Sequence, residues 1–230
     1  MNLREQYLEA LSIDVWVPRL WSVAALPERA ALPVAASPTP ESTSVWQTLE
    51  DEVRGCTRCG LCQTRTQTVF GVGERRAELL VIGEAPGQEE DAQGEPFVGR
   101  AGQLLNSMLR AMGNPRGTVY IANMLKCRPP NNRNPSPSEV ASCLPYLQRQ
   151  IDLIRPRLIL AVGGIAAQNL LATQTPVGRL RGQVHRFGAH GTPLVVTYHP
   201  AYLLRSPGEK GKAWTDLKFA RAELARARGK

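Results

Sequence analysis

The sequence predicts an α/β protein, a three-layer α/β/α sandwich around a central four-stranded, mainly parallel sheet. Four short apolar runs bounded by turn residues, over 79–83, 119–122, 158–162 and 194–198, resemble strands that are covered on both faces. Stretches with helical periodicity separate these runs, and strands that alternate with helices favour a parallel sheet. Ligands of such sheets bind beyond the carboxyl ends of the strands, so we expect the chemistry there.

The helix expected over 136–154 carries the clearest signals. Ser136 and Glu139 have the spacing of a capping box, and Pro137 stands at the first helical position. Apolar residues then recur at spacings of four and three, as on the buried face of a helix. The same reasoning predicts helices over 99–112, 164–171 and 213–226.

The chain divides into an appendage over 1–43 and one folded domain over 44–230. The appendage comprises an amphipathic stretch, 3–13, and a linker rich in Pro, Ala and Ser, 24–43, whose composition is too poor in periodic apolar residues to build a core. We expect the appendage to be dispensable for chemistry and to offer a docking tail for a protein partner. The remaining 187 residues are long enough for a single core.

Charge is spread unevenly along the chain. Residues 1–50 hold three arginines against six acidic residues, whereas the stretch 179–230 holds eleven basic against three acidic residues. A basic domain indicates a polyanionic partner, most commonly nucleic acid, although a merely solvated basic surface gives the same composition.

Cysteine spacing predicts a metal centre. Cys56 and Cys59 form a C-x-x-C pair, and Cys127 and Cys143 follow far downstream with fifteen residues between them. A tight turn and two later elements can aim four thiolates at one site, which suits either zinc or an iron–sulfur cluster. Cys62 is left over as an alternative ligand, and buried free thiols are the alternative to a metal site.

The cellular setting follows from what the sequence lacks. Residues 1–19 do not have the pattern of a signal peptide, and no apolar stretch reaches the roughly 18 residues of a membrane span. We therefore expect a cytoplasmic protein without a membrane partner, in which clustered cysteines are more often ligands than disulfides.

Polar residues follow the predicted strands. Gly83, Glu84, Ala85, Pro86 and Gly87 form a tight turn after the first strand, with an acidic group facing the expected cleft. Asn123 ends the second strand, where it serves either as a turn residue or as a group that reads an amide-like edge. The glycines at 163–164 match no nucleotide-binding motif and are interpreted as helix packing.

The fourth strand runs into His199, Pro200 and the apolar pair Leu203 and Leu204. A capping histidine followed by a buried loop is one interpretation. The other is a histidine that faces the cleft with a leucine wedge at its rim, as in enzymes that push apolar side chains into a base stack.

Taken in order, these motifs resemble family 4 uracil-DNA glycosylases, the iron–sulfur branch of the uracil-DNA glycosylase superfamily. The resemblance covers about 44–224 and includes the C-x-x-C pair and the segments 83–87 (GEAPG), 94–102 (GEPFVGRAG), 123–130 (NMLKCRPP) and 199–204 (HPAYLL). It implies an enzyme that flips uracil out of DNA and hydrolyses its N-glycosidic bond, leaving an abasic site. We expect it to act as a monomer.

The resemblance also implies roles for individual residues. Cys56, Cys59, Cys127 and Cys143 would hold a [4Fe–4S] cluster with a structural role. In the base pocket, formed with Gly83 and Ala85, Phe97 would stack on uracil, Asn123 would read its polar edge and Leu203 would fill the vacated space. The expected catalytic residues are His199 as anion stabiliser, Glu84 as carboxylate, and Glu90 and Asn132 in support.

Neighbouring families are less similar. A family 5 enzyme is expected to carry an apolar residue in place of Glu84, and the covalently trapping relative a histidine in the loop after Cys127, where this chain has 128–135 (RPPNNRNP). The sequence is also compatible with two other functions. One is a glycosylase with a broader specificity for deaminated bases, and the other is a non-catalytic iron–sulfur module that binds DNA or assists a polymerase. A pure binding module has no use for Glu84 and His199 together.

Overall fold

The computed structural model of the chain describes residues 40–188 and 190–229. The expected amphipathic stretch and most of the linker therefore lie outside the described residues. The helices are α2 (Pro40–Arg54), α3 (Gln88–Gln93), α4 (Arg100–Met112), α5 (Pro137–Ile154), α6 (Gly164–Leu170), α7 (Val177–Leu180), α8 (Pro200–Arg205) and α9 (Lys210–Arg228). The strands are β1 (Val72–Gly73), β2 (Leu79–Gly83), β3 (Tyr120–Asn123), β4 (Leu158–Val162), β5 (His185–Phe187) and β6 (Thr192–Thr197).

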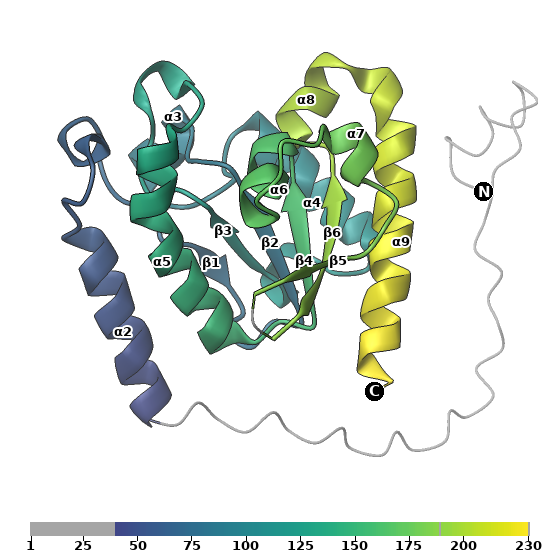
Figure 1. The fold of residues 1–230 in the computed structure, drawn as a ribbon, viewed down its shortest axis with the longest axis horizontal. Coiled ribbons are helices and arrows are strands. Elements are labelled where there is room, and N and C mark those ends of the chain that lie inside the picture. The colour runs from purple at the N-terminus through teal and green to yellow at the C-terminus, as the bar shows by residue number, and fades with distance from the viewer. Residues whose placement is uncertain (1–39, 189, 230) are drawn as a thin grey trace, which may run out of the picture. The chain divides into compact units, whose positions relative to one another are not determined.

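The strands form one sheet in the order β1-β3-β2-β4-β6-β5 (Figure 1). The inner four are parallel, as expected, and correspond to the four apolar runs. The expected number of four strands is wrong, because β1 and β5 add antiparallel edges. These edge strands have only two and three residues and no continuous apolar run, so periodicity does not reveal them.

Helices cover both faces of the sheet, which confirms the three-layer sandwich (Figure 1). One buried cluster joins alternate strand residues, such as Leu80 and Ile82, to residues of α2, α5, α6 and α7. The other cluster joins the intervening residues, such as Leu79 and Val81, to residues of α4, α8 and α9. Strands buried on both faces explain the continuous apolar runs.

Local signals set the ends of the helices. In α5, the Ser136 hydroxyl accepts from the Glu139 N–H at 3.3 Å, and the Glu139 carboxylate accepts from the Ser136 N–H at 2.8 Å, as the capping box predicts. His199 caps α8, since its Nδ1 accepts from the Ala201 N–H at 3.1 Å. The apolar segment after His199 is thus a helix and not a buried loop.

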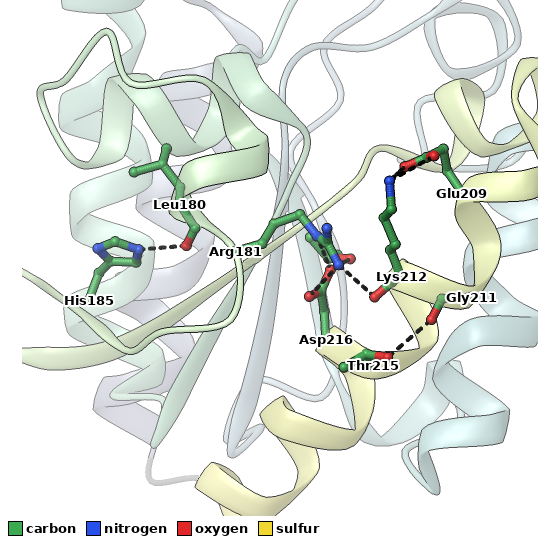
Figure 2. Close-up of polar contacts among 9 residues, drawn as sticks. Leu180, Arg181, His185, Glu209, Gly211, Lys212, Thr215 and Asp216 are labelled. Carbon is green, nitrogen blue, oxygen red and sulfur yellow. Dashed lines mark hydrogen bonds and ion pairs between the residues drawn. The ribbon is translucent and has the colours of Figure 1, made fainter.

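A buried ion pair joins the end of β6 to α7 and α9. Asp216, which is 2% exposed, accepts from Arg181 Nε at 2.6 Å and Nη2 at 2.9 Å (Figure 2). It also accepts from the Thr197 hydroxyl at 2.7 Å. The Arg181 guanidinium lies over the Tyr198 ring, 4.5 Å from its centroid. These contacts fix the residues immediately before His199.

Within the described part of the chain, no helix is long and apolar enough to cross a membrane.

Candidate active site

A cleft of about 430 Å³ opens at the carboxyl ends of β2, β3 and β6. It brings together most of the residues predicted to form the site: Glu84, Ala85, Glu90, Phe97, Asn123, Asn132 and His199. A larger cavity of about 750 Å³ lies at the opposite ends of the strands, beside the amino ends of β4 and β6. We place the active site in the smaller cleft because it holds the buried polar and titratable groups described below.

Asn123 carries an unusual atom. Its side chain is 2% exposed, and its Oδ1 is the one buried side-chain nitrogen or oxygen atom in the described residues without a hydrogen-bond partner. Buried acceptors are almost always satisfied, because leaving one unpaired costs about 1–3 kcal/mol. An orphan acceptor inside a cleft indicates a ligand that brings the missing donor.

Gly83 lies directly beside this acceptor. It pairs with Asn123 across the β2–β3 ladder, and a Cβ at position 83 would stand 2.4 Å from Asn123 Oδ1 and 2.5 Å from Phe97 Cζ. The absence of a side chain at Gly83 therefore lets the asparagine and the aromatic ring approach each other.

Phe97 forms another wall of the cleft. Its side chain is 6% exposed, and its ring centroid lies 5.7 Å from that of His199, with a 33° angle between the ring planes. The backbone of Phe97 has φ of 55°, in the left-handed region that residues other than glycine rarely adopt. Such strain persists only where surrounding contacts hold it, and it is concentrated at functional sites.

Two carboxylates line the cleft in different ways. Burial raises the pKa of Glu84, and no protein hydrogen bond to its carboxylate is found among the described residues. Glu90 instead accepts from the backbone N–H groups of Gly87, Val98 and Gly99, at 3.1, 3.0 and 3.2 Å. Glu90 therefore joins the loop that carries Glu84 to the loop that carries Phe97.

His199 is set up as a neutral donor. Burial, together with the charge of Arg205, lowers its pKa to about 4, so the imidazole is uncharged at neutral pH. Because Nδ1 accepts from the Ala201 N–H, the single ring proton resides on Nε2. A neutral imidazole with a fixed Nε2–H can donate to an oxygen in the cleft.

The position of Leu203 differs from the expected one. Leu203 is 1% exposed and packs in the core with residues of α4 and α9, whereas Tyr202 and Leu204 on the same helix are each 36% exposed. A helix turns by about 100° per residue, so neighbours in α8 face different directions. The structure thus corrects the expectation that Leu203 stands at the rim.

Asn132 lies on the loop after β3, at the cleft margin. It is exposed, has φ of 52°, and its Oδ1 accepts from Arg128 Nε at 2.8 Å. This contact organises the loop. Ala85 lies partly buried against the core and lines the cleft without offering a polar side-chain group.

The cysteines lie away from the cleft, around a small cavity between the loop after α2, the loop after β3, and α5. Cys56, Cys59, Cys62, Cys127 and Cys143 all line it. In the part of the chain that the structure describes, no group of three or more His, Cys, Asp or Glu side chains is arranged to hold a metal ion. The five thiols line one cavity, and four thiolates suit either an iron–sulfur cluster or a zinc ion.

Positive and amide groups face these sulfurs. Arg65 Nη1 donates to Cys127 Sγ at 3.1 Å, and the backbone N–H of Lys126 donates to Cys143 Sγ at 3.3 Å. Burial raises the pKa of the Cys127 thiol and raises that of Cys143 to about 11. Both thiols are therefore protonated in the metal-free protein, and metal binding would release their protons.

Sequence reasoning missed residues that act through their neighbours. Arg116 binds the loop that carries Phe97, and Lys126, which is 1% exposed, donates from Nζ to the Asn123 carbonyl at 2.9 Å and to Gln150 Oε1 at 2.6 Å. Arg116 stands in no recognisable motif. Lys126 lies within the motif that contains Asn123 and Cys127, but the sequence gives no sign that a lysine there is buried.

Comparison with known proteins agrees with this geometry. A family model described as the uracil DNA glycosylase superfamily matches residues 70–218, and the chain belongs to this superfamily. Within it, the chain falls among the type-4 uracil-DNA glycosylases, as the motifs predicted. It is 45% identical over 173 residues to the type-4 enzyme of Archaeoglobus fulgidus, covering 73% of this chain and 87% of that protein.

Other relatives fit the same placement. The type-4 uracil-DNA glycosylase of Thermotoga maritima is 42% identical over 160 residues, covering 69% of this chain and 82% of that protein. A type-5 uracil-DNA glycosylase from Pyrobaculum aerophilum is 30% identical over 148 residues, covering 57% and 64%. The type-5 likeness is weaker and covers less of both chains.

Proposed function

We propose that this protein removes uracil from DNA by hydrolysing the N-glycosidic bond, and that it leaves the abasic strand uncut. The observation that carries the proposal is the unpartnered Oδ1 of Asn123, buried in a cleft beside the ring of Phe97. Uracil presents an N3–H donor where cytosine presents an acceptor. An asparagine oxygen therefore accepts from uracil and repels cytosine.

Cleavage of the N-glycosidic bond in this cleft creates a negative charge on the base and a positive charge on the sugar. As the C1′–N1 bond breaks, its electron pair passes to the base, whose O2 becomes anionic, and the sugar becomes oxocarbenium-like. His199 donates from Nε2–H to that developing anion, and this interaction strengthens only as the bond breaks. Glu84, ionised, stabilises the sugar cation, orients the water that attacks C1′ and accepts the proton that this water loses. Glu90 and Asn132 hold the loops around these groups.

Release of uracil is the direct test. The purified protein should convert a uracil-containing oligonucleotide into an alkali-labile product and should leave the strand intact before alkali treatment. A matched oligonucleotide with cytosine at the same position should give no product. Intact DNA after alkali treatment, at micromolar enzyme, would reject the proposal, and strand breakage before alkali would reject its monofunctional part.

The pH dependence follows from Glu84. Burial raises its pKa, so its ionised form is lost, as pH falls, at a higher pH than for an exposed glutamate. Single-turnover rates should therefore fall on the acid side at a pH above the usual glutamate value of 4.5. His199, with a pKa of about 4, stays neutral over that range. Glu84→Gln should be slow at all pH values and lack this acid limb, and an unchanged limb would exclude Glu84 as its source.

Loss of the anion stabiliser, His199, and loss of the wedge should change the cleavage rates on single- and double-stranded DNA in different ways. His199→Ala should slow cleavage on the order of 100-fold on both single- and double-stranded DNA, since one donor to a developing anion is worth roughly 3 kcal/mol. We assign the wedge to Leu204 because it is an exposed leucine on α8, the helix from which Ala201, Tyr202 and Arg205 line the cleft. Leu204→Ala should slow cleavage more in duplex than in single strands, where the target base is already unstacked.

The wedge experiment has a matched control. Val45, on α2, is an apolar side chain of similar exposure, at 44%, outside the cleft. Val45→Ala should cleave both substrates at the parent rate. Equal losses on duplex and single strand for Leu204→Ala would remove the wedge assignment.

The thiol cavity supports a second part of the proposal: Cys56, Cys59, Cys127 and Cys143 hold a [4Fe–4S] cluster, with zinc as the rival metal. When bound, the cluster ties together the three segments that surround the cavity. Cys62 lines the same cavity but stands outside the ligand set, so Cys62→Ser should keep the metal while Cys143→Ser loses it. An absorption band near 400 nm that dithionite bleaches, with iron and sulfide by analysis, indicates the cluster, and stoichiometric zinc without iron would contradict it.

The last four residues of the appendage expected over 1–43 belong to α2, so we further propose that residues 1–39 form a protein-docking tail. We also propose that the enzyme acts as a monomer and works in the cytoplasm, where thiols stay reduced. Because α2 begins at Pro40, a protein that begins there keeps this helix whole. It should retain uracil release within a few fold and sediment as a monomer. A large loss of activity in a truncated protein with an unchanged melting temperature would show instead that the segment completes the site.

A further inference from the structure

Arg116, in the 3₁₀ helix over Arg116–Thr118, makes four contacts with the loop that leads to Phe97 and with α4. Its Nη2 donates to the Pro96 carbonyl at 2.7 Å and to Glu95 Oε1 at 2.8 Å. Its Nη1 donates to the Phe97 carbonyl and to Asn106 Oδ1, both at 3.3 Å. One guanidinium thus binds three consecutive loop residues and anchors them to a helix.

The loop needs such support because of the backbone of Phe97. Its φ of 55° is unfavourable for a residue with a Cβ, so Phe97 returns to an extended or helical conformation unless neighbouring contacts prevent it. Rotation about this backbone would carry the ring away from Gly83 and His199, which it contacts in the cleft.

A second contact acts on the same carbonyl. A Cβ at Gly102 would stand 1.8 Å from the Phe97 oxygen, so the first turns of α4 pack directly against this peptide. The Phe97 carbonyl is therefore enclosed between the backbone of α4 and the guanidinium of Arg116. Arg116 itself is not among the residues that line the cleft, and its side chain is 24% exposed.

We infer that Arg116 is a positioning residue for uracil release, which holds Phe97 in its left-handed conformation and so fixes the ring against which the flipped base stacks. This inference rests on the proposed function and extends it to a residue outside the cleft. The planar fork of arginine suits the role because it reaches several acceptors in fixed directions, which a lysine ammonium cannot do.

A double-mutant cycle tests the inference. Arg116→Met should lower the single-turnover rate of uracil release on the order of 10- to 100-fold, the range expected when a positioned group moves by about 1 Å. Affinity for uracil-free duplex should stay within about twofold, because only the ring position changes. In a Phe97→Ala background, where no ring remains to be positioned, Arg116→Met should cost less than about a further twofold.

Two variants sharpen the result. Arg116→Lys should recover only part of the rate, since a single ammonium does not replace the fork. Arg110→Met removes an exposed arginine at the last turn of α4 and should leave the rate unchanged. All rates are measured well below the melting temperature of each variant, so that unfolding does not contribute.

The outcomes separate two failures. If the parent enzyme releases uracil but the losses from Arg116→Met and Phe97→Ala multiply in the double variant, Arg116 does not act through Phe97 and the inference is wrong. If the parent enzyme releases no uracil, the proposed function itself fails, and this inference fails with it.

Discussion

Gly83→Ala should abolish most uracil release while the protein stays folded. The added methyl group would stand 2.4 Å from Asn123 Oδ1 and 2.5 Å from Phe97 Cζ, closer than any real contact allows. Either the asparagine or the ring must move, and a misplacement of about 1 Å costs on the order of 100-fold in rate. We therefore expect a loss of at least that size, measured under single-turnover conditions.

The glycine experiment also has a control within the chain. A Cβ at Gly211, in the first turn of α9, would meet nothing within 4 Å, and Gly211→Ala should leave the rate unchanged. Circular dichroism and thermal melting would show whether each variant is folded. A Gly83→Ala protein that releases uracil within a few fold of the parent would mean that Asn123 and Phe97 do not both act on the base.

Asp216→Ala should cause the largest loss of stability. Its carboxylate is 2% exposed and is hydrogen-bonded to Arg181 (Figure 2) and to the Thr197 hydroxyl. Its removal therefore leaves a largely buried guanidinium without its counter-charge. Breaking a buried ion pair in this way typically costs about 3–5 kcal/mol. For a domain of this size, we expect a melting temperature lower by roughly 10 °C.

A neighbouring pair in the same view provides the comparison. Lys212 and Glu209 form an exposed ion pair, with Nζ and Oε1 2.9 Å apart (Figure 2). Glu209→Ala should barely change the melting temperature, since solvent screens exposed pairs. Replacing both buried partners, as Arg181→Met with Asp216→Leu, should recover much of the lost stability. If Asp216→Ala melts with the parent, the ion pair contributes nothing net.

Much of the fold could be predicted because its signals are local or periodic. The inner strands are buried on both faces and appear as continuous apolar runs, and the cap of α5 needs only Ser136 and Glu139. The edge strands β1 and β5 could not be found, since their pairing depends on partners distant in sequence. The helix after His199 was missed because six residues are too few to establish a period.

Part of the candidate site could also be predicted from local motifs, and part of it could not. Motifs placed Glu84, Asn123 and His199 at strand ends, and the structure brings all three to one cleft. Which of the adjacent residues Leu203 and Leu204 is exposed depends on how α8 rotates against α4, and the sequence does not encode that rotation in any local signal. Long-range contacts also decide the role of Arg116, which lies nineteen residues from the carbonyl of Phe97.

The unpartnered Oδ1 of Asn123 also affects the relation between stability and activity in this protein. The side-chain oxygen of Asn123 has no hydrogen-bond partner from the protein among the described residues, so the fold itself gains nothing from an acceptor at this position. On the proposed assignment, a base with a matching donor supplies the missing partner, and ligand and fold then stabilise each other. If Asn123 recognises the base as proposed, position 123 is one where selection for stability alone would favour an apolar side chain and base recognition retains the amide.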